Sequence, residues 1–181
     1  MTIQAHGIDS GASSPTPSSS YYTTTQTDAN FLAKAGGNYL NSQLVRMEAN
    51  INGYDEGIVL GTAGLVSEGS GENIFAIKNG SIVTPESHYG ILPGITPHTA
   101  ITLIRDLGMH VEQRGIPREF LYVADEVFFT GTAAEITPTR ASDQVQISSG
   151  ERGLITGQIQ EAFFKVIRAE VDDRHGWLTF V

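Results

Sequence analysis

Apolar residues recur with a helical period in three segments of the chain, and each segment predicts an amphipathic helix. The first covers residues 38–52, where one face carries Leu40, Leu44, Met47 and Ile51. The second begins with Thr96 as its cap and Pro97 in its first turn, and its buried face is expected to hold Ala100, Ile101, Ile104 and Leu107. The third covers residues 153–169, with an inward face of Ile155, Ile159, Phe163, Val166 and Ile167.

Strands are predicted between these helices, in short runs of β-branched and aromatic residues. The segment 73–84 contains two such runs around Asn79 and Gly80, a pair that is typical of a type I′ hairpin. Further strands are expected at 57–61, 110–114, 126–130, 135–140 and 144–148, and a short helix is expected after Pro117. Because strands outnumber helices without regular strand–helix alternation, the pattern predicts an α+β domain built around a mixed barrel.

The first 30 residues differ in composition from the rest of the chain. Residues 10–27 are nearly all small or polar and have no apolar face to bury, so a disordered tail is expected over 1–30. The ordered domain is then expected over 31–181.

Charge and composition disfavour several classes of partner. The net charge of −9 argues against nucleic acid and against anionic membranes, both of which bind basic surfaces. The chain has no cysteine, so disulfides, thiolate chemistry and cysteine-based metal sites are excluded, and no metal site is expected. No apolar run reaches the length of a membrane span, and the N-terminus lacks the features of a secretory signal. We therefore expect a cytoplasmic protein.

One of the three lysines, Lys34, lies in an unusual context. The segment FLAKAGGNYL places it between apolar residues and close to Gly36 and Gly37. Burial lowers the pKa of a lysine and makes its amino group a nucleophile for a carbonyl, and glycines allow a bulky ligand to approach. A surface lysine before a helix is the alternative interpretation.

Three glycine-rich motifs suit an anionic cofactor. Glu68 lies among glycines in LVSEGSGENIF, where its carboxylate could face a pocket. The segment LPGIT leads into a helix N-terminus, which binds anions through its free N–H groups. The segment FFTGTAAEI places small residues after a strand, where exposed backbone amides suit a second anion contact. Ordinary turn and cap chemistry accounts for each motif taken alone.

Together, Lys34 and these motifs match the needs of pyridoxal phosphate: a lysine for the aldehyde, an acid for the ring nitrogen, and donors for the phosphate. The motifs themselves are specific, and in chain order they are KAGGNYLNS, LVSEGSGENIF, ILPGIT, YVADEVFFTGTAAEITP and HGWLTFV. From about Phe31 to Val181 they resemble the bacterial-type branched-chain amino acid aminotransferases, which are class IV, fold-type IV pyridoxal-phosphate enzymes. The resemblance implies that residues 31–181 form the cofactor-binding, C-terminal domain of that architecture.

The resemblance implies four roles around the cofactor ring. Lys34 would form the Schiff base with the aldehyde and later move the proton between Cα and C4′. Tyr39 would lie against the ring oxygen, and Leu92 would pack on the ring. Glu68 would pair with the pyridine nitrogen.

It also implies how the phosphate and the substrate are held. Ile95 and Thr96 would bind the phosphate at the helix N-terminus, with Thr132 as a second phosphate contact. Gly131 and Ala133 would line the pocket near the substrate carboxylate.

The activity that the resemblance implies is transfer of an amino group between leucine, isoleucine or valine and 2-oxoglutarate. The partners are then a small amino acid and a 2-oxo acid, and a homo-oligomer is expected. Family members carry an N-terminal domain before the lysine, which supplies an arginine to the phosphate. The first 30 residues show no likeness to it, so that domain is expected to be absent. Two alternatives stay open: a non-catalytic cofactor-binding or remnant domain, and another fold-type IV reaction such as D-amino acid transamination.

Overall fold

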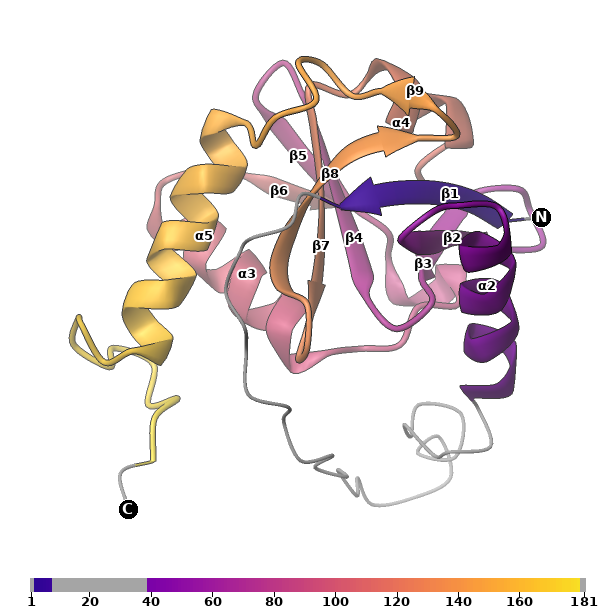
Figure 1. Cartoon of the computed structure of the whole chain (residues 1–181). Coiled ribbons are helices and arrows are strands. Elements are labelled where there is room, and N and C mark those ends of the chain that lie inside the picture. Colours follow the sequence, from indigo (N-terminus) through magenta and orange to yellow (C-terminus); the bar gives the residue numbers. More distant parts are fainter. Residues whose placement is uncertain (1, 8–38, 180–181) are drawn as a thin grey trace.

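The structure is a computed structural model that describes residues 2–7 and 39–179. Its strands are β1 (Thr2–Gly7), β2 (Glu56–Leu60), β3 (Val66–Gly69), β4 (Asn73–Lys78), β5 (Ser81–Thr84), β6 (Val111–Gln113), β7 (Glu126–Gly131), β8 (Glu135–Ser142) and β9 (Val145–Gln146). Its helices are α2 (Tyr39–Ile51), α3 (Ile95–Asp106), α4 (Arg118–Val123) and α5 (Leu154–Ile167), with a short 3-10 helix, η2, at Ser87–Tyr89. Figure 1 shows their arrangement in space.

The strands form one sheet in the order β3-β2-β1-β8-β7-β4-β5-β6, with β9 paired to β8. The pair β5–β6 is parallel, and the other pairs are antiparallel. The two ends of the sheet meet: the Val66 N–H donates to the Ile116 carbonyl at 2.8 Å, and Leu65 forms a bridge with Pro117. This closure confirms the expected α+β domain with a mixed barrel.

Two hydrophobic cores lie on opposite faces of the sheet. Along β4, Ile74 belongs to the first core and Phe75 to the second, as the two-residue period of a strand requires. The second core is covered by α3 and α5, which Figure 1 shows side by side against the sheet. There Phe75 stacks on Phe128 of β7 with ring centroids 4.8 Å apart.

The hairpin between β4 and β5 has the predicted turn. Asn79 has φ 51° and Gly80 has φ 78°, the two positive values that a type I′ turn requires. The register pairs Lys78 with Ser81, so the turn contains two residues as expected.

The expected N-terminal tail is wrong for residues 2–7. These residues form β1, which pairs with β2 on one side and with β8 on the other. Without β1, the facing edges of β2 and β8 would leave backbone groups unpaired in the middle of the sheet, which is costly. The strand was not predicted because the alternating segment TIQAHG is short and is followed by a long polar segment. The rest of the expected tail, residues 8–30, lies outside the described part of the chain.

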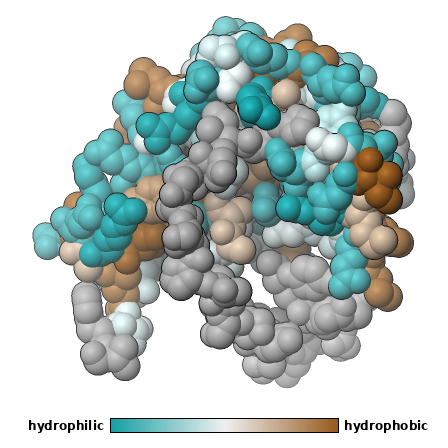
Figure 2. All heavy atoms as spheres, in the orientation of Figure 1, coloured by the Kyte–Doolittle hydropathy of each residue, from teal (hydrophilic) through white to brown (hydrophobic). Residues whose placement is uncertain are grey.

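Helix α2 confirms the first helical prediction, but its apolar stripe faces solvent. Val45 and Ala49 are its buried side chains, while Leu40, Leu44, Met47 and Ile51 are each 58–81% exposed. Figure 2 shows hydrophobic atoms along the outer side of this helix. We call these four exposed residues the α2 stripe.

Candidate functional site

Helix α3 begins two residues earlier than the sequence predicted. Its N-cap is Gly94, with no side-chain cap, and the His98 N–H makes the first helical bond to the Gly94 carbonyl at 3.3 Å. Thr96 is therefore not the cap; it lies in the first turn and is buried. Pro97 fits there because an N–H in the first turn has no partner inside the helix. The N–H groups of Ile95 and Thr96 remain as donors for an anion, close to the Thr96 hydroxyl.

A network of polar contacts joins this helix start to Glu68 on β3. The Leu92 N–H donates to Glu68 Oε2 at 2.8 Å, and the Leu92 carbonyl accepts from Asn73 Nδ2 at 3.0 Å. Asn73 is buried, and its Oδ1 lies only 3.0 Å from the place that a Cβ on Gly94 would occupy. Glycine at position 94 thus lets the chain pass Asn73 closely before α3 begins.

The turn after β7 lies at the same edge of the sheet. Asn73, the first residue of β4, pairs with Thr130, and β7 ends one residue later at Gly131. A Cβ on Gly131 would lie 3.3 Å from Glu72 Cγ, so the turn packs directly on the loop between β3 and β4. Thr132 and Ala133 are exposed, so their backbone amides can be reached by a ligand.

The structure therefore brings together the three predicted motifs, at Glu68, at Leu92 to Thr96 and at Gly131 to Ala133. We call this group the candidate site. Its donors and its carboxylate are the chemical groups that a phosphate and a protonated ring nitrogen require, so the residues present fit pyridoxal phosphate. Tyr39 is the first residue of α2, and only its backbone is described. Lys34 lies outside the described residues.

Sequence reasoning missed two acids next to the candidate site. Glu56, at the start of β2, is only 5% exposed and accepts hydrogen bonds from the Gly57 and Ser70 N–H groups at 2.7 and 3.0 Å. Arg46 of α2 forms an ion pair with its other oxygen. Glu72 lies in the loop between β3 and β4, and burial, followed by the nearby Glu56, raises its pKa to about 7. The sequence offered a sign of Glu72, because the motif EGSGEN contains two acids, Glu68 and Glu72, and only Glu68 was considered as a site residue.

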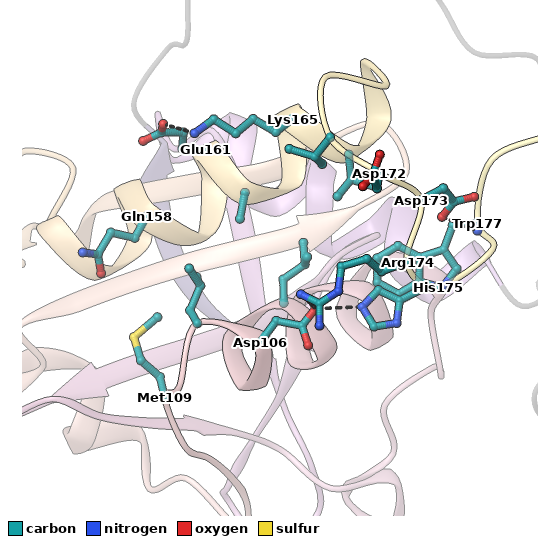
Figure 3. Close-up of a pocket in the computed structure, with 15 residues that line it drawn as sticks. Asp106, Met109, Gln158, Glu161, Lys165, Asp172, Asp173, Arg174, His175 and Trp177 are labelled. Carbon is teal, nitrogen blue, oxygen red and sulfur yellow. Dashed lines mark hydrogen bonds and ion pairs between the residues drawn. The ribbon is translucent and has the colours of Figure 1, made fainter.

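A separate hollow lies between α3, α5 and the C-terminal segment (Figure 3). Its volume is about 790 Å³, and Asp106 and Trp177 are among its lining residues. Asp106 ends α3, so the hollow is removed from the helix start by the length of a 12-residue helix, or roughly 18 Å. Lys165, the one lysine among its described lining residues, pairs with Glu161 at 2.7 Å. The hollow is therefore distinct from the candidate site.

The described residues, 2–7 and 39–179, contain neither a metal-ligand cluster nor a membrane-spanning helix. In these ranges, no three histidine or acidic side chains are grouped as metal ligands would be. No helix there is long and apolar enough to cross a membrane.

Comparison with known proteins identifies the family. The family model for amino-transferase class IV matches residues 4–141. The chain belongs to the class IV aminotransferases. It is also 51% identical over 146 residues to the branched-chain-amino-acid aminotransferase of Escherichia coli (strain K12), covering 81% of this chain and 47% of that protein. The chain thus spans about half the length of the curated relatives it matches.

Solved structures agree with the family and the fold type. The branched-chain amino acid aminotransferase from Thermobaculum terrenum, in its PLP-bound holo-form, is 41% identical with a TM-score of 0.78, covering 81% of this chain and 48% of that one. The enzyme from Thermoproteus uzoniensis, solved with norvaline, is 46% identical with a TM-score of 0.78, covering 82% of this chain and 49% of the other. These neighbours confirm the fold-type IV aminotransferase architecture for the matched portion.

Proposed function

We propose that this chain is the cofactor-binding portion of a pyridoxal-phosphate aminotransferase that exchanges amino groups between branched-chain amino acids and 2-oxoglutarate. The observation that carries the proposal is the convergence of Glu68, the start of α3 and the Gly131 turn at one edge of the sheet. The hydrogen bond from the Leu92 N–H to Glu68 links the acid to the anion donors directly. Family membership and the names of the relatives support the choice of substrates.

Each residue has one task in this proposal. Lys34 would hold the cofactor covalently before substrate binds, and its amino group, once released, would move a proton at the substrate Cα, while Tyr39 would contact the ring oxygen. Glu68 keeps a proton on the ring nitrogen, and Leu92 covers the ring. When bound, the cofactor supplies an electron sink for the bonds at Cα.

The anion contacts divide between phosphate and substrate. The Ile95 and Thr96 N–H groups bind the phosphate, because both lie in the first turn of α3, and Thr132 adds a hydroxyl. The backbone at Gly131 and Ala133 holds the substrate carboxylate. Donors fixed in this way orient an anion without reorganising during the reaction.

The assembly and location are part of the same proposal. The α2 stripe is an exposed apolar surface along one helix, which is typical of a contact with another protein surface. We therefore retain the homo-oligomer predicted from the sequence. The cytoplasmic location stays a prediction that rests on composition.

The test is a titration of the purified chain with pyridoxal phosphate, followed by borohydride reduction and peptide mapping. Lys78 and Lys165 are matched controls in the same molecule, because both are engaged in ion pairs, at 2.7 Å from Asp125 and Glu161. Near-stoichiometric label on Lys34 alone supports the proposal. Equal labelling of all three lysines would contradict it.

An amino-transfer assay then separates the two alternatives. Transfer from L-leucine to 2-oxoglutarate supports the proposed substrates. Transfer from D-alanine instead would indicate the D-amino acid reaction. Label on Lys34 without any turnover would indicate a cofactor-binding domain that is not catalytic in isolation.

A further inference from the structure

Glu72 lies against the part of the candidate site that the proposed function assigns to the substrate carboxylate. Its Cγ is 3.3 Å from the place that a Cβ on Gly131 would occupy. Its own carbonyl accepts from the Gly69 N–H at 2.6 Å, which folds the loop between β3 and β4 back toward β7. The Glu72 side chain therefore packs on the backbone that precedes Thr132 and Ala133.

Glu72 and its neighbour Glu56 have very different surroundings. Glu56 is held by two backbone N–H groups, from Gly57 and Ser70, and by the Arg46 guanidinium. Both oxygens of the Glu56 carboxylate therefore have partners. For Glu72, by contrast, no hydrogen bond from the described residues is among the causes that shift the pKa of its carboxyl group.

Taken together, burial and the nearby charged groups oppose the ionisation of Glu72. Burial disfavours its charged form most, and the Glu56 carboxylate on β2 adds repulsion. Arg46 on α2, which forms an ion pair with Glu56, acts in the opposite direction but is the weakest of the three influences. The pKa of Glu72 is consequently about 7, so the free site holds this proton only part of the time near neutral pH.

A carboxylate ligand at the Gly131 turn would add a second negative charge beside Glu72. Like charges in a poorly solvated site favour the neutral form of the acid. We propose that Glu72 is the proton-linked residue of this site, which takes up a proton from solvent when a carboxylate binds at the Gly131 turn and returns it when the ligand leaves. This inference rests on the proposed function, because it uses the carboxylate position assigned there.

Calorimetry on the chain loaded with pyridoxal phosphate tests the linkage. The probe is 4-methylvalerate, a branched-chain carboxylate without an amino group, titrated at pH 7 in two buffers that differ in ionisation enthalpy, so that the difference in heat counts protons. We expect uptake of about half a proton per ligand, since a group with a pKa of about 7 is half protonated in the free site. The apparent Kd should rise about tenfold from pH 6 to pH 8.

Three variants separate the linkage from a structural effect. Glu72→Gln, which mimics the protonated acid, should abolish both the proton uptake and the pH dependence of Kd. Glu56→Gln removes the repelling charge and lowers the pKa of Glu72 in the free site, so the pH dependence of Kd should shift to lower pH and the uptake at pH 7 should rise above half a proton. Glu112→Gln changes an exposed acid on β6 and should leave both unchanged.

The outcomes distinguish this inference from the proposed function. Label on Lys34 and binding of 4-methylvalerate without proton uptake would overturn the role of Glu72 and leave the proposed function intact. Uptake that persists in Glu72→Gln would overturn it as well. Failure of the wild-type chain to label on Lys34 would reject the proposed function and, with it, the role of Glu72.

Discussion

Glu126 anchors the start of α5 from a different element of the fold. It is the first residue of β7, and its two carboxylate oxygens accept from the Ile155 and Thr156 N–H groups at 3.0 and 2.7 Å. The N-cap residue, Gly153, has no side chain to do this. A Cβ built on Gly153 would overlap the Glu126 carboxyl group, so the glycine and the acid depend on each other.

The geometry sets the size of the effect of Glu126→Ala. Each hydrogen bond to a charged group contributes about 1.5–3 kcal/mol, and water recovers part of that at a helix end. Loss of the charge at the positive end of the helix adds about 0.3–1 kcal/mol. We expect the free energy of unfolding to fall by about 2–3 kcal/mol in total, or about 4–12 °C in Tm for a chain of this size. Glu126→Gln should cost roughly half as much, since the amide keeps one acceptor.

Urea unfolding followed by far-UV circular dichroism measures these changes. Glu161→Ala is the matched control, because Glu161 is an exposed acid on α5 that pairs with Lys165 one turn away. It should shift the midpoint much less than Glu126→Ala.

A double-mutant cycle with Gly153→Ala gives the sharpest test. In the wild-type chain the new methyl group displaces Glu126 and should destabilise the fold. In Glu126→Ala the obstacle is gone, so Gly153→Ala should cost little. Additive effects of the two substitutions, or a Glu126→Ala midpoint equal to that of the control, would refute this account of the helix start.

Three further predictions concern the site and the surface. Asn73→Ala removes the donor to the Leu92 carbonyl and should weaken pyridoxal phosphate binding about threefold to tenfold, measured by absorbance titration. Glu72→Gln should be more stable than wild type by on the order of 2 kcal/mol at pH 8. The reason is that the raised pKa of Glu72 makes the wild-type chain lose stability as the pH rises from about 4.5 to 7. Urea unfolding midpoints of the two chains that differ by the same amount at pH 4.5 and pH 8 would contradict this. Leu44→Glu should reduce self-association in sedimentation velocity, whereas Gln43→Glu on the same helix should not.

Features that are set by residues adjacent in the sequence could be predicted from the sequence. The Asn79–Gly80 turn followed from the sequence, because both residues tolerate positive φ without help from distant groups. The start of α3 was misplaced by two residues, because proline is accepted at several positions of a first turn. The motif around Glu68 was recognisable, but its bond to the Leu92 N–H joins residues 24 positions apart and has no local signature.

The sequence by itself determined which segments form most of the helices and strands, which residues bear the family motifs, and where the hairpin turns. Only the tertiary structure decided that Thr2–Gly7 is a strand in the middle of the sheet, because its partners are β2 and β8. It also decided that Glu126 anchors α5 and that Glu72 lies beside Glu56, since long-range packing sets both the burial of an acid and the charges around it. Periodicity reports the face of an element, whereas hydrogen bonding and protonation depend on what the fold places against that face.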